Sequence, residues 1–296
     1  MLILAACTQS KRGAVPLRRR LRHHEAAGSP AAVADTWGAA LREPARGARR
    51  LTDLYKGGYW SAALDLRDSL PGADLGVVSA GLGFVPAAAA HSPYSATFSS
   101  GHPDSVPGAS QSSGRAEWWQ LLGASDRLRA AIDSARQVLV VLPNRYLDVV
   151  ADDLLGRDRG HVLVFASECP RPLSDRLGER LFRVRAPMVR RLGTNVSALA
   201  PKAAAFALAG GAGELGRVHR RLATLMADSE QPLYPSREKQ TPDQVAAWLR
   251  AALASDEPPT SATAALRSFR GSGRAFEQKR FHRLFHQVVE STRGTP

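Results

Sequence analysis

The sequence of 296 residues predicts an α/β protein built on a mostly parallel sheet that is flanked by helices. Four short apolar runs, each of four or five residues and rich in Val, Leu and Ile, are typical of buried parallel strands. Longer segments with the apolar period of a helix lie between them, and strands that alternate with helices form parallel sheets. The four expected strands are residues 2–6, 75–78, 138–142 and 162–165.

The remaining elements follow from the spacing of apolar residues. Residues 18–50 are rich in Arg and Ala, and we expect one or two exposed helices or an ordered arm there. Trp118 and Trp119 lie on the apolar side of an expected helix and are interpreted as core residues. The expected helical segments are 51–68 (the motif LTDLYKGGYW and then a helix), 116–135, 144–155 (a loop and then a helix), 173–184 (a helix and then a short strand) and 195–225, interrupted at 210–213.

Composition places a domain boundary near residue 230. We expect an α/β domain over residues 1–230 and a helical, basic C-terminal extension over residues 231–296. The extension begins with a turn-rich break at 232–239, and residues 256–263 resemble a linker. Its expected helices are residues 243–254 and 276–290, and the second carries one apolar stripe of Phe281, Leu284, Phe285 and Val288.

The positive charge is concentrated in two segments. The formal net charge is +13; residues 11–50 contribute +7 and residues 267–296 contribute +5. Clustered positive charge on an otherwise nearly neutral chain favours a polyanion as partner, and we expect double-stranded DNA. The candidate DNA contacts are Lys11, Arg12, Arg18, Arg19 and Arg20 in the first segment, and Arg274, Lys279, Arg280 and Arg283 in the second.

Several classes of protein find no support in the sequence. No apolar run is long enough to span a membrane, and the apolar start is too short for a signal peptide. The two cysteines provide neither a disulfide framework nor a metal-ligand spacing, so we expect a cytoplasmic protein without a metal. No P-loop or GxGxxG motif is present, and we expect no cofactor. The GxSxG motif of serine hydrolases is also missing from the sequence. The sequence does not indicate an oligomeric state.

Four loops should meet at one edge of the sheet, because the carboxyl ends of parallel strands lie together and bind ligands there. These loops are residues 7–12, 79–104, 143–146 and 166–170. They carry hydroxyls, carboxylates, an amide and aromatic rings, an inventory that suits the binding and release of a flipped nucleobase. The candidate substrate-binding residues are Ser10, Tyr55, Ser79, Tyr94, Ser95, Tyr146 and Glu168.

Asp104 and Asn144 are the candidate catalytic residues. Cleavage of a glycosidic bond passes through a sugar cation, which a carboxylate stabilises, while an amide reads the base or holds the water. Ordinary structural roles remain open for both residues, since Asp104 could cap a turn and Asn144 follows Pro143. The long loop itself could also be a mobile surface loop.

Five short motifs occur in a fixed order: CTQSKR at 7–12, DLYKGGYW at 53–60, VVSAGLGF at 77–84, PYS at 93–95 and PNRYL at 143–147. In this order the chain resembles the YaaA-like and DUF6884-like proteins and the PYS-containing domain of archaeosine synthases. The resemblance covers roughly residues 1–170 and implies a fold related to the uracil-DNA glycosylase superfamily, together with contact to nucleobases. The chain is also similar to antiviral glycosylases that remove modified bases from phage DNA.

Two departures bear on the catalytic acid. Ser92 stands before Pro93-Tyr94 where uracil-DNA glycosylases carry an acid, and His102-Pro103-Asp104 only loosely matches their His-Pro-Ser loop. Asp104 is therefore chosen from its chemistry, with Glu168 and Asp53 in reserve. The expected function is that of a DNA glycosylase acting on a modified base. The alternatives are a non-catalytic DNA-binding stress-response protein and an enzyme that modifies a deazaguanine-type base in RNA.

Overall fold

The computed structural model describes the whole chain except residues 44–46, 157–160, 210–214, 228–236 and 294–296. The chain divides into two compact units, Met1–Glu230 and Gln231–Pro296, and this division coincides with the boundary expected from the sequence. The expected interruption at 210–213 and the first part of the expected break, 232–236, lie outside the described residues. The two units are described separately below.

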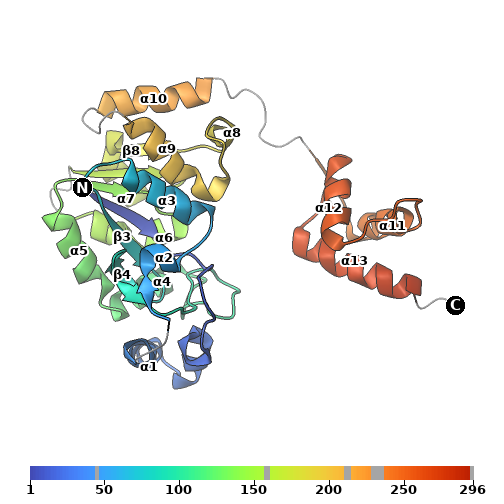
Figure 1. Cartoon of the computed structure of the whole chain (residues 1–296), viewed down its shortest axis with the longest axis horizontal. Coiled ribbons are helices and arrows are strands. Elements are labelled where there is room, and N and C mark those ends of the chain that lie inside the picture. The colour runs from blue at the N-terminus through green and yellow to red at the C-terminus, as the bar shows by residue number, and fades with distance from the viewer. Residues whose placement is uncertain (44–46, 157–160, 210–214, 228–236, 294–296) are drawn as a thin grey trace. The chain divides into compact units, whose positions relative to one another are not determined.

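A six-stranded sheet forms the centre of the first unit, in the order β4-β3-β1-β6-β7-β8 (Figure 1). Neighbouring strands are parallel except β4, which pairs antiparallel with β3. The prediction of an α/β fold with a mostly parallel sheet is thus confirmed. The strands are β1 (Leu2–Ala6), β3 (Asp74–Ser79), β4 (Gly83–Pro86), β6 (Val138–Val140), β7 (Val162–Ala166) and β8 (Leu181–Arg183).

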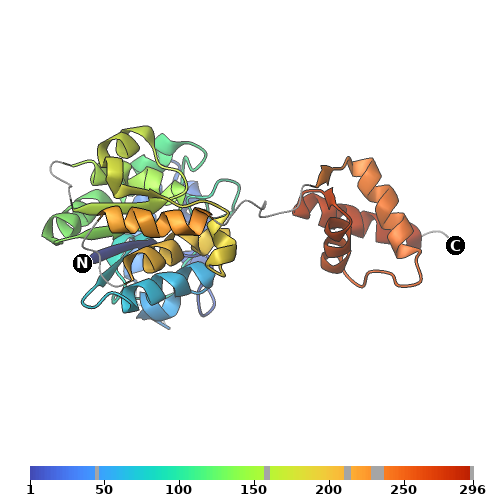
Figure 2. The same cartoon turned by 90° about the horizontal axis from the view of Figure 1, so that it is seen from above.

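Helices cover both faces of this sheet (Figures 1 and 2). One face carries α3 (Gly58–Asp68) and α9 (Leu199–Leu208), and α10 (Leu215–Ala227) packs on α9. The other face carries α4 (Ser112–Leu121), α5 (Ala124–Ser134), α6 (Asn144–Leu154) and α7 (Arg171–Leu177). Helix α1 (Pro30–Arg42) is as long as α10. The shorter elements are 3-10 helices at Leu17–Arg19, Leu21–Ala27, Gly178–Arg180 and Val196–Ala198, helices α2 (Leu51–Leu54) and α8 (Met188–Arg191), and the paired strands β2 (Arg49–Arg50) and β5 (Ala90–His91).

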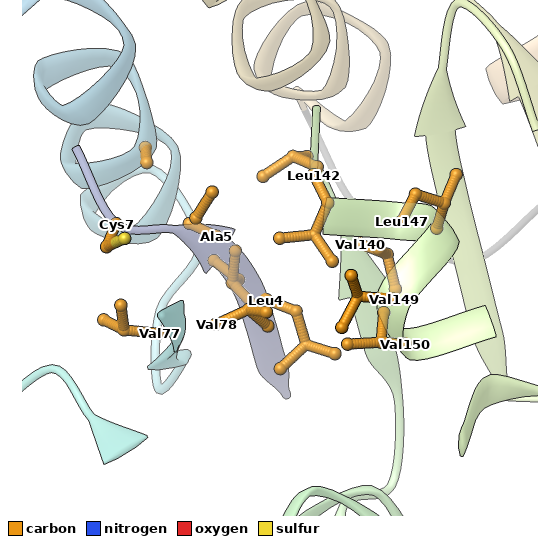
Figure 3. Close-up of a cluster of buried hydrophobic side chains, with 14 of the residues drawn as sticks. Leu4, Ala5, Cys7, Val77, Val78, Val140, Leu142, Leu147, Val149 and Val150 are labelled. Carbon is orange, nitrogen blue, oxygen red and sulfur yellow. The ribbon is translucent and has the colours of Figure 1, made fainter. Parts of the chain in front are cut away.

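The core lies between the sheet and these helices. Figure 3 shows side chains of β1 and β6 meeting those of α6, with Leu4 and Val140 facing Val150, while Val77 of β3 lies on the side away from α6. Ile3 and Leu4 are fully buried, and burying one such side chain stabilises the fold by roughly 1.5–3 kcal/mol. Strands buried on both faces explain why the sequence shows continuous apolar runs rather than alternation.

Two expectations about local structure are wrong. Residues 83–86 were expected in a loop but form β4, because Gly83 adopts a φ of +71° and turns the chain back along β3. The single helix expected over 116–135 is two helices, separated at Gly123, which lies in the left-handed region. Trp118 and Trp119 are core residues as expected, and their ring N–H groups donate to the Ala80 carbonyl and the Asp153 carboxylate.

The second unit contains α11 (Pro242–Leu253), α12 (Ala262–Gly271) and α13 (Gln278–Arg293), with the short parallel pair β9 (Glu238–Lys239) and β10 (Arg274–Ala275). The expected linker is shorter than predicted, because the Ser261 side chain caps α12 by accepting the Ala264 N–H. Phe281, Phe285 and Val288 are buried as the stripe on α13 predicts, and Leu284 is half-buried. Among the described residues, no helix combines the length and apolar character that a membrane span requires.

Candidate functional site

The order of the strands reverses beside β1. The chain leaves β1 over the face that carries α3 and returns as β3, whereas it leaves β6 over the opposite face through α6 and continues as β7. In doubly wound sheets, connections that diverge in this way open a crevice at the carboxyl ends of the two neighbouring strands, where ligands bind. The residues that follow β1, β3, β6 and β7 are therefore the candidate site.

A buried cluster of three hydroxyls, Tyr55, Ser79 and Tyr94, lies beside the ends of β1 and β3. The Tyr94 hydroxyl is 2.6 Å from both the Tyr55 hydroxyl and Ser79 Oγ. Ser79 Oγ also accepts the N–H groups of Gly81 and Leu82, so its own proton points to Tyr94, whose proton in turn points to Tyr55. A Cβ atom at Gly81 would lie 2.6 Å from the Tyr94 ring, which is why glycine is required there.

Lys11 covers this hydroxyl cluster. Its Nζ lies 4.2 Å from the centre of the Tyr94 ring and donates to the Thr8 carbonyl oxygen at 2.8 Å. Burial lowers the pKa of the Lys11 ammonium from its ordinary value of 10.5, and the nearby Cys7 and Asp104 partly oppose this shift. Because Lys11 is only 9% exposed, the expectation that it contacts DNA phosphates does not fit its position.

Two further tyrosines join β1 to the end of β6. The Tyr59 hydroxyl accepts the Ala6 N–H at 2.8 Å and donates to the Val141 carbonyl at 3.0 Å. The Tyr146 hydroxyl lies 3.3 Å from Cys7 Sγ, and its ring contacts Phe98 of the long loop edge to face. These contacts bring the loop after β3 and the first turn of α6 to the same edge of the sheet.

Three buried tyrosines, Tyr55, Tyr59 and Tyr94, and the half-buried Tyr146 predict a cooperative alkaline transition. Burial raises the pKa of Tyr55, Tyr59, Tyr94 and Tyr146 above the ordinary value of 10.0. Folding holds their protons, so the stabilisation is complete below pH 10 and is lost as the pH rises above it. We expect the four phenols to ionise together as the helices unfold, followed by tyrosinate absorbance and circular dichroism. Gradual ionisation of these phenols near pH 10 with the helices intact would contradict this prediction.

Asp104, the residue expected to act as catalytic carboxylate, is enclosed. Its Oδ2 accepts the Ser95 hydroxyl at 2.6 Å, and its Oδ1 accepts the Arg22 N–H at 3.3 Å and lies 3.8 Å from Arg22 Nε. The residue is 1% exposed. These bonds tie the long loop to the 3-10 helix Leu21–Ala27, so the carboxylate has a structural role in this arrangement. Asp104 bonds to these partners rather than to Asn144, the residue beside which it was expected.

Asn144 instead pairs with Glu168 and Ser167 at the ends of β6 and β7. Its Nδ2 donates to Glu168 Oε2 at 3.0 Å, and its Oδ1 accepts the Ser167 hydroxyl at 3.1 Å. Glu168 and Ser167 are exposed, and Asn144 is half-buried. The structure thus brings Asn144 and Glu168 together, with a carboxylate that solvent or a ligand can reach.

The other predicted residues fall in different surroundings. Ser10 is exposed, and its carbonyl accepts the Lys56 N–H. Asp53 lines a cavity of about 830 Å³ with Met1 and Asp74, the residues at the opposite, amino-terminal end of β1 and β3, so it is removed from the candidate site.

Some of the residues predicted to contact DNA are held by other parts of the chain, and others are exposed. Arg19 is 3% exposed and donates to the Leu41 and Glu43 carbonyls, so it does not fit a phosphate contact. Arg18 pairs with the Glu43 carboxylate at 2.8 Å. The side chains of Arg12, Lys279, Arg280 and Arg283 are exposed, and those of Arg20 and Arg274 are half-buried.

Sequence reasoning missed three residues that build the site. Cys7 and Tyr59 belong to the motifs CTQSKR and DLYKGGYW, and membership of these motifs could have indicated both residues as part of the site. Nothing in the sequence indicates that Arg22 contacts Asp104, because the two residues are 82 positions apart in the chain. Among the described residues, no group of three or more His, Cys, Asp or Glu side chains is placed to hold a metal ion.

The chain was compared with family models, curated proteins and solved structures. No family model matches the chain, and no curated protein or solved structure matches it either.

Proposed function

We propose that the protein is a DNA glycosylase that hydrolyses the N-glycosidic bond of a modified base and leaves an abasic site. The observation that carries this proposal is the pair of Glu168 and Asn144, joined at 3.0 Å at the carboxyl ends of β6 and β7. A carboxylate and an amide of this kind can orient a water molecule and stabilise the cation that forms on the sugar.

Glu168 replaces Asp104 as the catalytic carboxylate in this proposal. A carboxylate that acts on the sugar has to reach it, and Glu168 is exposed whereas the Asp104 side chain is 2% exposed. Glu168 also lies beside Asn144, the other expected catalytic residue. Asp104, in turn, positions the loop that carries Tyr94 and Ser95 through its bond to Ser95.

The buried cluster supports the site without taking part in the chemistry. Lys11, Tyr55, Ser79 and Tyr94 come from four segments and hold the loops after β1 and β3 in one arrangement. Rigid loops at the strand ends keep reacting groups in position, which contributes strongly to catalysis.

A non-catalytic DNA-binding protein is the second candidate. The hydrogen bonds within the buried cluster favour this candidate, because Tyr94, Ser79 and Asp104 already have hydrogen-bond partners within the chain. Polar groups that satisfy one another stabilise a fold without requiring a substrate.

One incubation separates these candidates. The protein is mixed with plain duplex DNA, hypermodified phage DNA and RNA, and free bases are identified by mass spectrometry. We expect release of a modified base from the phage DNA alone. Binding to DNA without release of any base favours the second candidate, and release from RNA would contradict DNA as the substrate.

A further inference from the structure

The C-terminal unit has a core of its own. Val245, Leu249, Leu266, Phe269 and Phe281 form a buried cluster from α11, α12 and α13 that is separate from the core of the first unit. The ring of Phe269 lies 5.1 Å from that of Trp248 and 5.2 Å from that of Phe281. The start of α11 is fixed by a capping box between Thr241 and Gln244. The unit therefore presents its surface side chains on a fixed frame.

A groove of about 460 Å³ lies on this unit between α12 and the start of α13. Three arginines line it: Arg237, Arg267 and Arg270. Arg237 Nε donates to the Arg270 carbonyl at 3.1 Å, and Arg270 Nη2 donates to the Phe276 carbonyl at 3.3 Å. These bonds hold two of the guanidinium groups at the groove, and further donors on each remain for a ligand. The lining is completed by Thr263, Leu266, Gly271 and Gln278.

Positive charge predominates among the described residues that line this groove. Within the described part of the unit, no carboxylate forms an ion pair with any of the three arginines. The Glu277 carboxylate accepts the N–H groups of Lys279 and Arg280 at 2.8 Å, and these bonds lower its pKa. The groove has three positive charges, and Arg274 and Lys279 lie in the same segment of the chain. Positive charge concentrated in this way attracts an anion from outside the chain.

We propose that this groove binds the backbone phosphates of double-stranded DNA through Arg237, Arg267 and Arg270. Guanidinium groups match phosphate geometry, and several of them on one fixed surface suit a repeating polyanion better than a single small anion. Only the choice of DNA rests on the proposed function. Contacts to backbone phosphates do not depend on the base sequence. Binding by the groove is therefore tested with plain DNA that contains no modified base.

The salt dependence of binding tests this groove. Binding of the full chain to a plain duplex is measured by fluorescence anisotropy at several salt concentrations, for the parent and Arg267→Gln. Arg267 is exposed and its removal leaves the core intact. We expect weaker binding and a log–log salt slope reduced by about one, as for the loss of one phosphate contact. The triple variant with Arg237→Gln, Arg267→Gln and Arg270→Gln should lose about three units of slope.

Arg250→Gln is the matched control, because Arg250 is an exposed arginine of α11 that does not line the groove. It should bind like the parent. Equal slopes for Arg267→Gln and Arg250→Gln would overturn the proposal, and so would tighter binding of the parent to polyglutamate or to RNA than to duplex DNA. If the slope changes as expected while the parent releases no base, the groove stands and the glycosylase proposal fails.

Discussion

Replacing Glu168 by Gln should slow base release by about a hundredfold or more, which is the usual effect of removing one electrostatic stabiliser of a transition state. The substitution keeps the size of the side chain and a carbonyl oxygen that can accept the bond from Asn144 Nδ2. Because Glu168 is exposed, the melting temperature should stay close to that of the parent. Single-turnover release of base from modified DNA is the measurement.

Two control variants test whether the effect is specific to Glu168. Glu179→Gln removes another exposed carboxylate of the same unit and should release base at the parent rate. Asp104→Asn should retain most of the activity of the folded protein but melt at a lower temperature, because a buried carboxylate loses its charge beside Arg22. Full activity in Glu168→Gln together with loss of activity in Asp104→Asn would return the catalytic role to Asp104.

Phe269→Ala should unfold the C-terminal unit. Phe269 is fully buried between Trp248 and Phe281, and truncating a buried Phe costs about 3–5 kcal/mol. A unit of this size has a total stability of about the same magnitude. Calorimetry should show loss of one transition while the first unit melts unchanged, and binding to plain DNA should weaken with it.

Phe276→Ala is the control for this prediction, because Phe276 is half-buried in the same unit. It should leave both transitions in place. A common shift of both transitions in Phe269→Ala would show that the two units do not fold separately.

The sheet was predictable because its strands are buried on both faces. Strands β1, β3, β6 and β7 lie where continuous apolar runs occur, and parallel pairing follows from the helical segments between them. β4 was not predictable in the same way, since it depends on the turn at Gly83 and on pairing with β3. Helix α12 was not predicted, because residues 256–263 resemble a linker and the helix begins only after its cap at Ser261.

The site was only partly predictable. Parallel pairing of the strands could place the loops after β1, β3, β6 and β7 at one edge, and the structure places them there. It could not show that Arg22 reaches Asp104, or that Lys11 folds over Tyr94 instead of extending from the basic segment. Contacts of this kind depend on packing between distant segments, which a local pattern of charge or polarity does not record.

If the protein removes a modified base from DNA, as we propose, abasic sites should form in that DNA. The parent protein is incubated with plain and with hypermodified phage DNA, both are treated with alkali, and strand breaks are counted on a denaturing gel. We expect breaks in the hypermodified DNA and none above background in the plain DNA. An absence of breaks in every modified DNA, with binding to the same DNA retained, would contradict the claim.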